Sequence, residues 1–101
     1  MSLQIRIPKE KIVRFCFNHN IRKFALFGSV LGEDFQPKSD VDVLLEFEPG
    51  MRIGFFKLYD MEQELSQLLE GRRIEINTPD SISPYFRDEV LNKAEVQYVQ
   101  T

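Results

Sequence analysis

Asp40 and Asp42 have a type and spacing that suggest chemistry, because they lie two residues apart at the start of an alternating apolar run. Residues two apart in a β-strand point to the same side and are roughly 6 to 7 Å apart along it, so both carboxylates would enter one small volume. A divalent cation removes their mutual repulsion, and Mg²⁺ is usually held by one or two carboxylates while water and substrate phosphate take the other positions. The pair therefore predicts a metal site shared with a phosphate ligand.

A Gly-Ser dipeptide, Gly28-Ser29, closes an earlier apolar run, and ten residues separate it from Asp40. Glycine permits a close approach of the backbone to a ligand. The serine hydroxyl and the free N–H groups of a short helix after it can bind phosphate oxygens. We therefore expect a phosphate site that adjoins the metal site.

Glu75 is the acid of the third predicted strand, where it alternates with Ile74 and Ile76. On a strand beside the aspartates it would act as the third acid and as a general base, taking a proton from an attacking hydroxyl while two metal ions neutralise a triphosphate. The product would be a nucleotidyl ester. Each part of the pattern is common by itself, since acids on a strand aid solubility and turns take Gly and Ser. The combination is what indicates a site.

Apolar periodicity and chain breakers predict the elements that carry these residues. In chain order they are a helix over 8–19, a strand over 21–27, a very short helix over 29–32, a loop over 33–39, a strand over 40–47, a helix over 54–69, a strand over 72–77, a helix from 83 and a short edge strand over 96–101. This order predicts an α+β (α/β-like) fold with a small sheet of three to four strands flanked by helices.

The apolar stripes predict which helix faces are buried. The long helix has a stripe made of Phe55, Leu58, Met61, Leu65, Leu68 and Leu69, and the last helix has one made of Phe86, Val90, Leu91 and Ala94. Cys16 is expected to be a buried thiol, and His19 to cap the first helix. Nine phenylalanines exceed the needs of one small core, so some aromatic residues are expected at a protein interface, the candidates being Phe35, Phe56, Tyr85 and Tyr98.

One soluble domain is the expected organisation of the 101 residues, of which 43% are hydrophobic. No run of about 18 apolar residues and no apolar segment behind a basic start is present, so we expect neither a membrane helix nor a secretory signal, and a cytoplasmic location. The net charge is −3, and residues 33–48 hold six acids against one lysine. Such an edge repels phosphate unless cations are present, which argues against direct nucleic-acid binding.

The pattern of Gly28-Ser29, ten residues and Asp40-Val41-Asp42 is similar to that of nucleotidyltransferases of the DNA polymerase beta superfamily. The small size, the LFGS lead-in, the run VDVLLEFEPG and the ending SPYFRDEVLNKAEVQYV resemble the minimal nucleotidyltransferase (MNT) family. The resemblance covers roughly Phe24 to Tyr98. It implies a nucleotidyltransferase fold with a mixed sheet, and a single minimal nucleotidyltransferase domain over residues 1–101.

Many members of that family are antitoxins encoded beside a HEPN-domain ribonuclease toxin, and some transfer AMP from ATP to a tyrosine of the toxin. The resemblance thus implies a Mg²⁺-dependent enzyme with ATP as its substrate and a HEPN toxin as its partner in a hetero-oligomer. Carried over by position, Gly28 and Ser29 would hold the triphosphate, while Asp40, Asp42 and Glu75 would bind two Mg²⁺ ions and carry out catalysis.

Two differences from the family pattern keep a second function open. The family often has an Arg directly after Gly-Ser, where this chain has Val30-Leu31, and its third acid is commonly Asp instead of Glu75. The alternative is a catalytically weak or inactive module that neutralises a toxin by binding alone. Transfer to a small molecule such as an aminoglycoside has less support, because we expect a single domain without a second one to bind it. Candidate replacements for the missing cation are Arg52, Lys57, Arg72 and Arg73.

Overall fold

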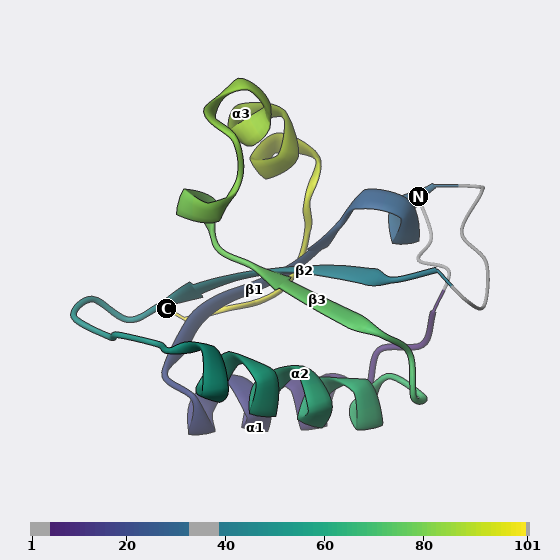
Figure 1. Cartoon of the computed structure of the whole chain (residues 1–101). Coiled ribbons are helices and arrows are strands. Elements are labelled where there is room, and N and C mark those ends of the chain that lie inside the picture. The colour runs from purple at the N-terminus through teal and green to yellow at the C-terminus, as the bar shows by residue number, and fades with distance from the viewer. Residues whose placement is uncertain (1–4, 33–38, 101) are drawn as a thin grey trace.

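A four-stranded mixed sheet forms the middle layer of the molecule, with helices on both of its sides (Figure 1). The computed structural model describes residues 5–32 and 39–100. The elements follow the predicted order and are α1 (Lys9–Asn18), β1 (Ile21–Phe27), the 3₁₀ helix η1 (Gly28–Leu31), β2 (Val41–Phe47), α2 (Phe55–Leu68), β3 (Ile74–Asn77), the 3₁₀ helix η2 (Pro79–Ser81), α3 (Pro84–Lys93) and β4 (Glu95–Val99).

The strand order in the sheet is β3-β2-β1-β4. β1 runs antiparallel to both β2 and β4, whereas β2 and β3 are parallel and are joined through α2. The fold class and the edge strand at the end of the chain are therefore confirmed. The pairing of β2 with two partners decides which side chains meet, because Asp42 lies opposite Phe27 on one side and opposite Glu75 on the other.

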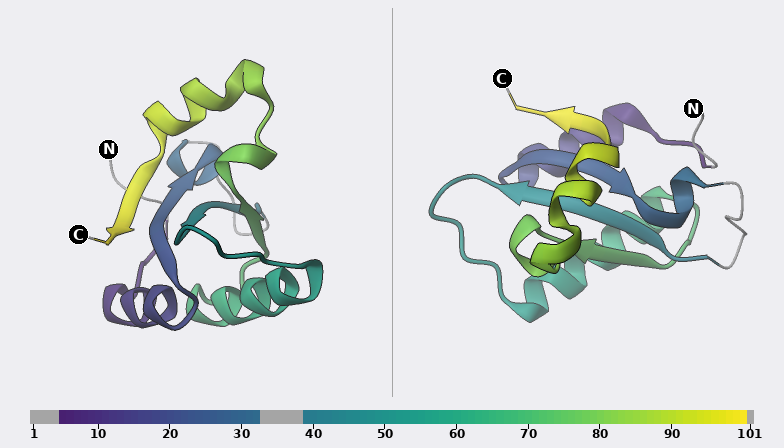
Figure 2. Two further views of the ribbon diagram at one scale, coloured as in Figure 1. Left: turned by 90° about the vertical axis from the view of Figure 1, so that its left-hand side faces the viewer. Right: turned by 90° about the horizontal axis from the view of Figure 1, so that it is seen from above.

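The hydrophobic core lies between one face of the sheet and the layer formed by α1 and α2, which run side by side beneath it (Figure 2). In β2, alternation turns Val41, Val43 and Leu45 into this core, so Asp42 faces the opposite side. The other core residues come from the strands, from η1 and from both helices, and are Ile12, Phe15, Cys16, Ile21, Phe24, Leu26, Val30, Met61, Leu65, Leu69 and Ile74.

Several predicted helix ends and buried residues are confirmed. Gly71 follows α2 with a φ of +79°, and its N–H donates to the carbonyl of Ser66 at 2.7 Å, which closes the helix. His19 is the C-terminal cap of α1, and its ring also bonds Glu64 at 2.9 Å. Cys16 is fully buried, and this burial raises the pKa of its thiol to about 12.

Two expectations about buried faces are wrong. Phe55 is the first residue of α2 and is 90% exposed, because the helix begins there and its contact with the core starts further along, at Met61 and Leu65. α3 has no buried residue, so the expected buried face of Phe86, Val90, Leu91 and Ala94 is also wrong: Phe86 is exposed and the other three are half-buried. The reason is that α3 stands on the side of the sheet away from α1 and α2 (Figure 2).

Smaller differences concern boundaries. β2 begins at Val41, β3 at Ile74 and α2 at Phe55, one or two residues after the expected starts. The expected loop over 33–39 and the interface candidate Phe35 lie outside the described residues, except for Ser39. None of the described helices is long and apolar enough to cross a membrane.

Candidate active site

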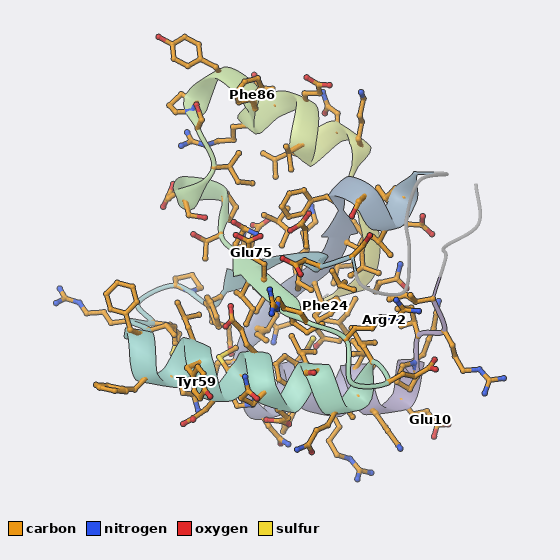
Figure 3. All side chains as sticks on the ribbon, turned by 45° about the vertical axis from the view of Figure 1, so that its right-hand side comes forward. Glu10, Phe24, Tyr59, Arg72, Glu75 and Phe86 are labelled. Carbon is orange, nitrogen blue, oxygen red and sulfur yellow. The ribbon has the colours of Figure 1, made fainter. Side chains whose placement is uncertain are left out.

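The parallel pairing of β2 and β3 brings Asp42 and Glu75 together on the face of the sheet opposite α1 and α2. Their strand neighbours Val41, Val43 and Ile74 are buried in the core, so both carboxyl groups project to the other side. Figure 3 shows Glu75 on this face, across the sheet from α2. The structure thus places the predicted third acid beside one of the two predicted aspartates.

The two carboxyl groups are close enough to share a proton. The pKa of Asp42 rises from 3.8 to about 6, first because burial disfavours its charged form, then through a hydrogen bond with Glu75 and through the negative charges of Glu75 and Asp40. Two ionised carboxylates at this separation repel, and only a proton or a cation relieves that repulsion. The pair therefore has the donor chemistry that a divalent cation needs.

Asp40 lies just before β2 and has different contacts. Its backbone carbonyl accepts a hydrogen bond from the Ser29 hydroxyl at 3.4 Å, and its carboxylate is 3.9 Å from the Arg73 guanidinium. Arg73 lies beside Asp40 because its backbone carbonyl accepts a hydrogen bond from the N–H of Val41 at 2.8 Å. The Arg73 side chain is 82% exposed, so this ion pair is weak and easily exchanged.

Among the described residues, no three or more His, Cys, Asp or Glu side chains are placed to hold a metal ion as they stand. Asp42 and Glu75 are brought together, whereas Asp40 is turned toward Arg73 and acts on Asp42 through its charge. A three-carboxylate metal site therefore stays a prediction. A movement of the Asp40 side chain away from its exposed partner would be needed to complete it.

Gly28 connects the carboxylate pair with the Gly-Ser turn. Its φ of +77° is a left-handed conformation, and a Cβ at this position would collide with the Asp42 carboxylate oxygen Oδ2. Only glycine fits without displacing that carboxylate. The turn therefore adjoins the carboxylate pair, and their roles as phosphate site and metal site stay a prediction.

The position where the family often has Arg is occupied by Val30, which is fully buried in the core. A side chain there points away from the surface on which the carboxylates lie, and η1 itself contains no cation. A cation that sequence reasoning missed is Lys93 on α3, which lines a pocket together with Gly28. Its position on a different element, more than sixty residues along the chain, left no local signal.

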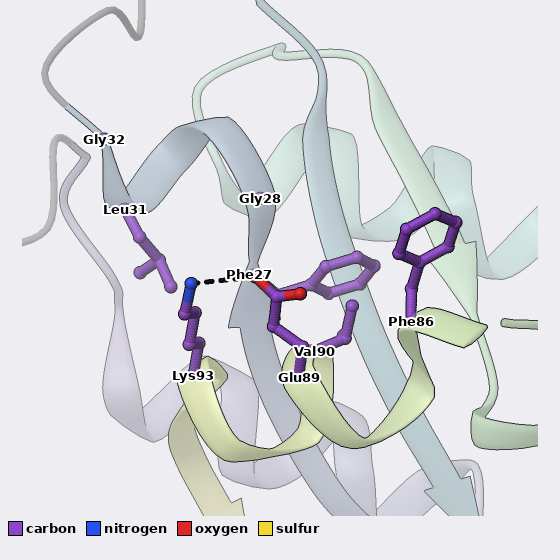
Figure 4. A pocket seen from close by; sticks show the side chains of 8 residues that line it. All are labelled: Phe27, Gly28, Leu31, Gly32, Phe86, Glu89, Val90 and Lys93. Atoms are coloured by element: carbon purple, nitrogen blue, oxygen red, sulfur yellow. Dashed lines mark hydrogen bonds and ion pairs between the residues drawn. The ribbon is translucent and has the colours of Figure 1, made fainter. Parts of the chain in front are cut away.

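The pocket, of about 790 Å³, lies between η1 and α3 (Figure 4). It exists because α3 stands off the sheet, and its size is that of a typical small-molecule site. Its walls are mostly apolar, and an ion pair between Lys93 and Glu89 at 2.9 Å crosses one side. The residues that line it are Phe27, Gly28, Leu31, Gly32, Phe86, Glu89, Val90 and Lys93.

Two side chains hold the elements around the site in place. Arg87 anchors α3 to the segment before it, because its guanidinium donates to the carbonyls of Pro79 at 2.7 Å and Ile82 at 3.1 Å. Glu62 of α2 accepts from the N–H of Ile76 at 3.2 Å and so supports the edge strand that carries Glu75.

Comparison with known proteins identifies the family. The family model "Polymerase beta, Nucleotidyltransferase" matches residues 10–100. The chain is 31% identical over 92 residues to the "Putative protein adenylyltransferase MJ0435" of Methanocaldococcus jannaschii, covering 91% of this chain and 96% of that protein.

Solved structures share the fold. A structure described as a "putative minimal nucleotidyltransferase" matches with a TM-score of 0.69 at 29% identity, over 85% of each chain. A toxin-antitoxin structure with AMP-PNP matches with a TM-score of 0.73 at 15% identity, over 94% of this chain and 76% of that one. A complex of tri-AMPylated Shewanella oneidensis HEPN toxin with MNT antitoxin matches with a TM-score of 0.60 at 16% identity, over 91% and 70%. This chain therefore belongs to the polymerase beta nucleotidyltransferase family, and is similar to its minimal members.

Proposed function

We propose that this protein is the antitoxin of a toxin-antitoxin pair and transfers AMP from ATP to a tyrosine or other hydroxyl of a HEPN-type ribonuclease toxin. The observation that carries the proposal is the pair of Asp42 and Glu75 packed against the Gly28 turn. Support comes from the relative named as a "putative protein adenylyltransferase" and from the fold shared with a complex of AMPylated HEPN toxin and MNT antitoxin.

Mg²⁺ fits this site, because a cation would relieve the repulsion between Asp42 and Glu75 that, together with burial, raises the pKa of Asp42. Asp40, Asp42 and Glu75 would hold two such ions. When bound, the ions neutralise charge on the triphosphate and on the leaving pyrophosphate. Binding is expected to strengthen as pH rises through about 6, since the metal competes with the shared proton.

The ATP molecule would extend from the Gly-Ser turn into the pocket under α3. Backbone groups of Gly28 and Ser29 bind the phosphates, and the apolar walls formed by Phe27, Phe86 and Val90 receive the base. Lys93 would supply the cation that η1 lacks.

The transfer step follows from these positions. The acceptor hydroxyl oxygen attacks the α-phosphorus of ATP, the bond from that phosphorus to the bridging oxygen breaks, and pyrophosphate leaves. Glu75 takes the proton of the hydroxyl as the general base. The products are an AMP ester of the toxin, which inactivates it, and pyrophosphate.

The test is transfer of labelled AMP from ATP to the cognate HEPN toxin in the presence of Mg²⁺. Asp42→Asn is expected to lower the rate by about 100-fold or more. The matched control is Glu46→Gln, because Glu46 lies at the other end of β2 and pairs with Arg22 at 3.2 Å. If neither the wild type nor Asp42→Asn transfers labelled AMP to the toxin, the enzymatic function is refuted.

A second candidate function is neutralisation by binding alone in a hetero-oligomer, which the burial of Val30 and the absence of a cation from η1 favour. In that case a double variant, Asp40→Asn with Asp42→Asn, should still protect cells from the toxin. Loss of protection with retained folding would contradict this function and favour the enzyme.

A further inference from the structure

Four large apolar side chains around the start of α2 are left uncovered. Phe55 and Phe56 are each 90% exposed, Tyr59 is 60% exposed, and Met51, in the segment before the helix, is 41% exposed. We call Met51, Phe55, Phe56 and Tyr59 the α2 aromatic cluster. Tyr59 is four residues after Phe55 and three after Phe56, so the three rings are neighbours on the helix surface. Large apolar groups gathered on a surface mark an interaction site.

The cluster and the carboxylate pair lie on opposite sides of the sheet. α2 covers the core face, whereas Glu75 projects from the other face, and Figure 3 shows Tyr59 and Glu75 in these places. Substitutions in the cluster therefore leave the side chains of Asp42 and Glu75 unaltered. Docking and AMP transfer can therefore use separate surfaces.

The area of the cluster is that of a protein contact. An aromatic side chain buries about 150–250 Å² at an interface, so the three rings at their exposures would bury about 500 Å². A standard interface buries about 800 Å² on each partner. The cluster can thus form the centre of a stable interface, with polar residues around it completing the area.

Charges beside the cluster indicate the chemistry of the partner. Arg52 and Lys57 are exposed next to the aromatic rings, and the ion pairs found within the described residues include neither of them. Asp60 is the exposed acid of the same turn. In a symmetric contact between two copies the same patch meets itself, which would bring the two cations of each copy together. A different protein with acidic groups around an apolar centre fits better.

We propose that the α2 aromatic cluster is the docking surface for the HEPN-type toxin, which meets it with an apolar patch bordered by acidic residues. The identity of the partner rests on the proposed function, but the surface does not depend on AMP transfer. The cluster is thereby assigned to capture of the toxin, and the carboxylate pair to its modification.

The experiment measures the Kd of the purified cognate toxin for the full chain. Phe55→Ser with Phe56→Ser is expected to raise the Kd by about 100-fold, because exposed aromatic anchors dominate interface affinity. The matched control is Phe17→Ser on α1, which removes a phenylalanine that is 79% exposed outside the cluster. The control should stay within about 3-fold of the wild type. Circular dichroism verifies that each variant is folded.

A charge reversal gives a second readout that does not alter the rings. Arg52→Glu with Lys57→Glu should raise the Kd by about 10-fold and reduce its dependence on salt. If the toxin binds the Phe55→Ser, Phe56→Ser variant with the Kd of the wild type, the docking surface is wrong and the enzymatic function is unaffected. If the wild type binds the toxin through the cluster but transfers no AMP to it, the enzymatic function is wrong and the docking surface stands. Failure of the wild type to bind the toxin, or cluster-dependent binding of a single-stranded RNA oligonucleotide in its place, overturns the docking proposal.

Discussion

Asp42→Asn is predicted to stabilise the protein at neutral pH while it removes AMP transfer. The pKa of Asp42 is raised to about 6 from 3.8, so the folded protein disfavours its ionised form more than the unfolded chain does. The stability that depends on this group is fully present below about pH 4 and is lost as pH rises through about 6. Asparagine has no charge to lose, and its amide can donate to Glu75 in place of the shared proton.

The magnitude follows from the shift. About two pKa units at 1.36 kcal/mol each set an upper bound of about 3 kcal/mol. Asp42 is only half-buried, so water screens part of the repulsion and about 1 kcal/mol is a more reasonable expectation. In a protein of this size that corresponds to a rise in Tm of about 4–8 °C.

The assay is chemical unfolding of the wild type and Asp42→Asn between about pH 4 and about pH 8. The two proteins should be nearly equal in the free energy of unfolding at the acid end, and the variant should gain about 1 kcal/mol above about pH 7. Glu75→Gln should raise the free energy of unfolding in the same way. The double variant should gain less than the sum of the two single gains, because both substitutions remove the same repulsion. A variant less stable than the wild type at neutral pH, or a difference that does not change with pH, would refute the reasoning.

Three further predictions follow from the same geometry. Gly28→Ala should destabilise the fold by about 1–3 kcal/mol in denaturant titrations, because the new Cβ meets Asp42 in a left-handed backbone, and unchanged stability would count against the close contact. The rate of AMP transfer should fall as pH decreases through about 6, since the carboxylate pair takes up a proton there; a flat pH-rate profile would argue against this pair as the centre of the reaction. Cys16 should react with a thiol reagent only as fast as the protein unfolds, as monitored by absorbance, and rapid labelling of the native protein would contradict its burial.

Local patterns were enough to predict most of the sheet and the face of it on which Asp42 and Glu75 lie. The alternation of Val41, Val43 and Leu45 predicts that Asp42 faces away from the core, and Glu75 alternates in the same way between two isoleucines. Gly28 carries its own signal because a turn after a strand favours a residue with a positive φ. Elements whose residues repeat with a clear period are therefore predictable one at a time.

Features that depend on the relative placement of elements were not predictable. Apolar periodicity shows that Phe86 prefers burial, but it does not show whether another element covers α3. The contact between Asp40 and Arg73 follows from the parallel register of β2 and β3, and Lys93 lines the pocket only because α3 lies beside η1. Each of these requires the three-dimensional arrangement of segments that are distant in the chain.

The burial of Val30 gives a physical meaning to the missing Arg. Its side chain is a core residue, so a cation at that position would have to leave the core or remain buried without a partner. In the proposed function a phosphate-binding cation therefore has to come from another element, and the candidate is Lys93, which lines the pocket with Gly28.

The intact mass of the cognate toxin, purified from cells that produce it together with this protein, tests the central claim most directly. With the wild type or Glu46→Gln, the toxin is expected to gain the mass of one or more AMP groups, and with Asp42→Asn it should keep its unmodified mass. An unmodified toxin beside the wild-type protein, or an equally modified toxin beside Asp42→Asn, would contradict the assignment of Asp42 and Glu75 as the centre of AMP transfer.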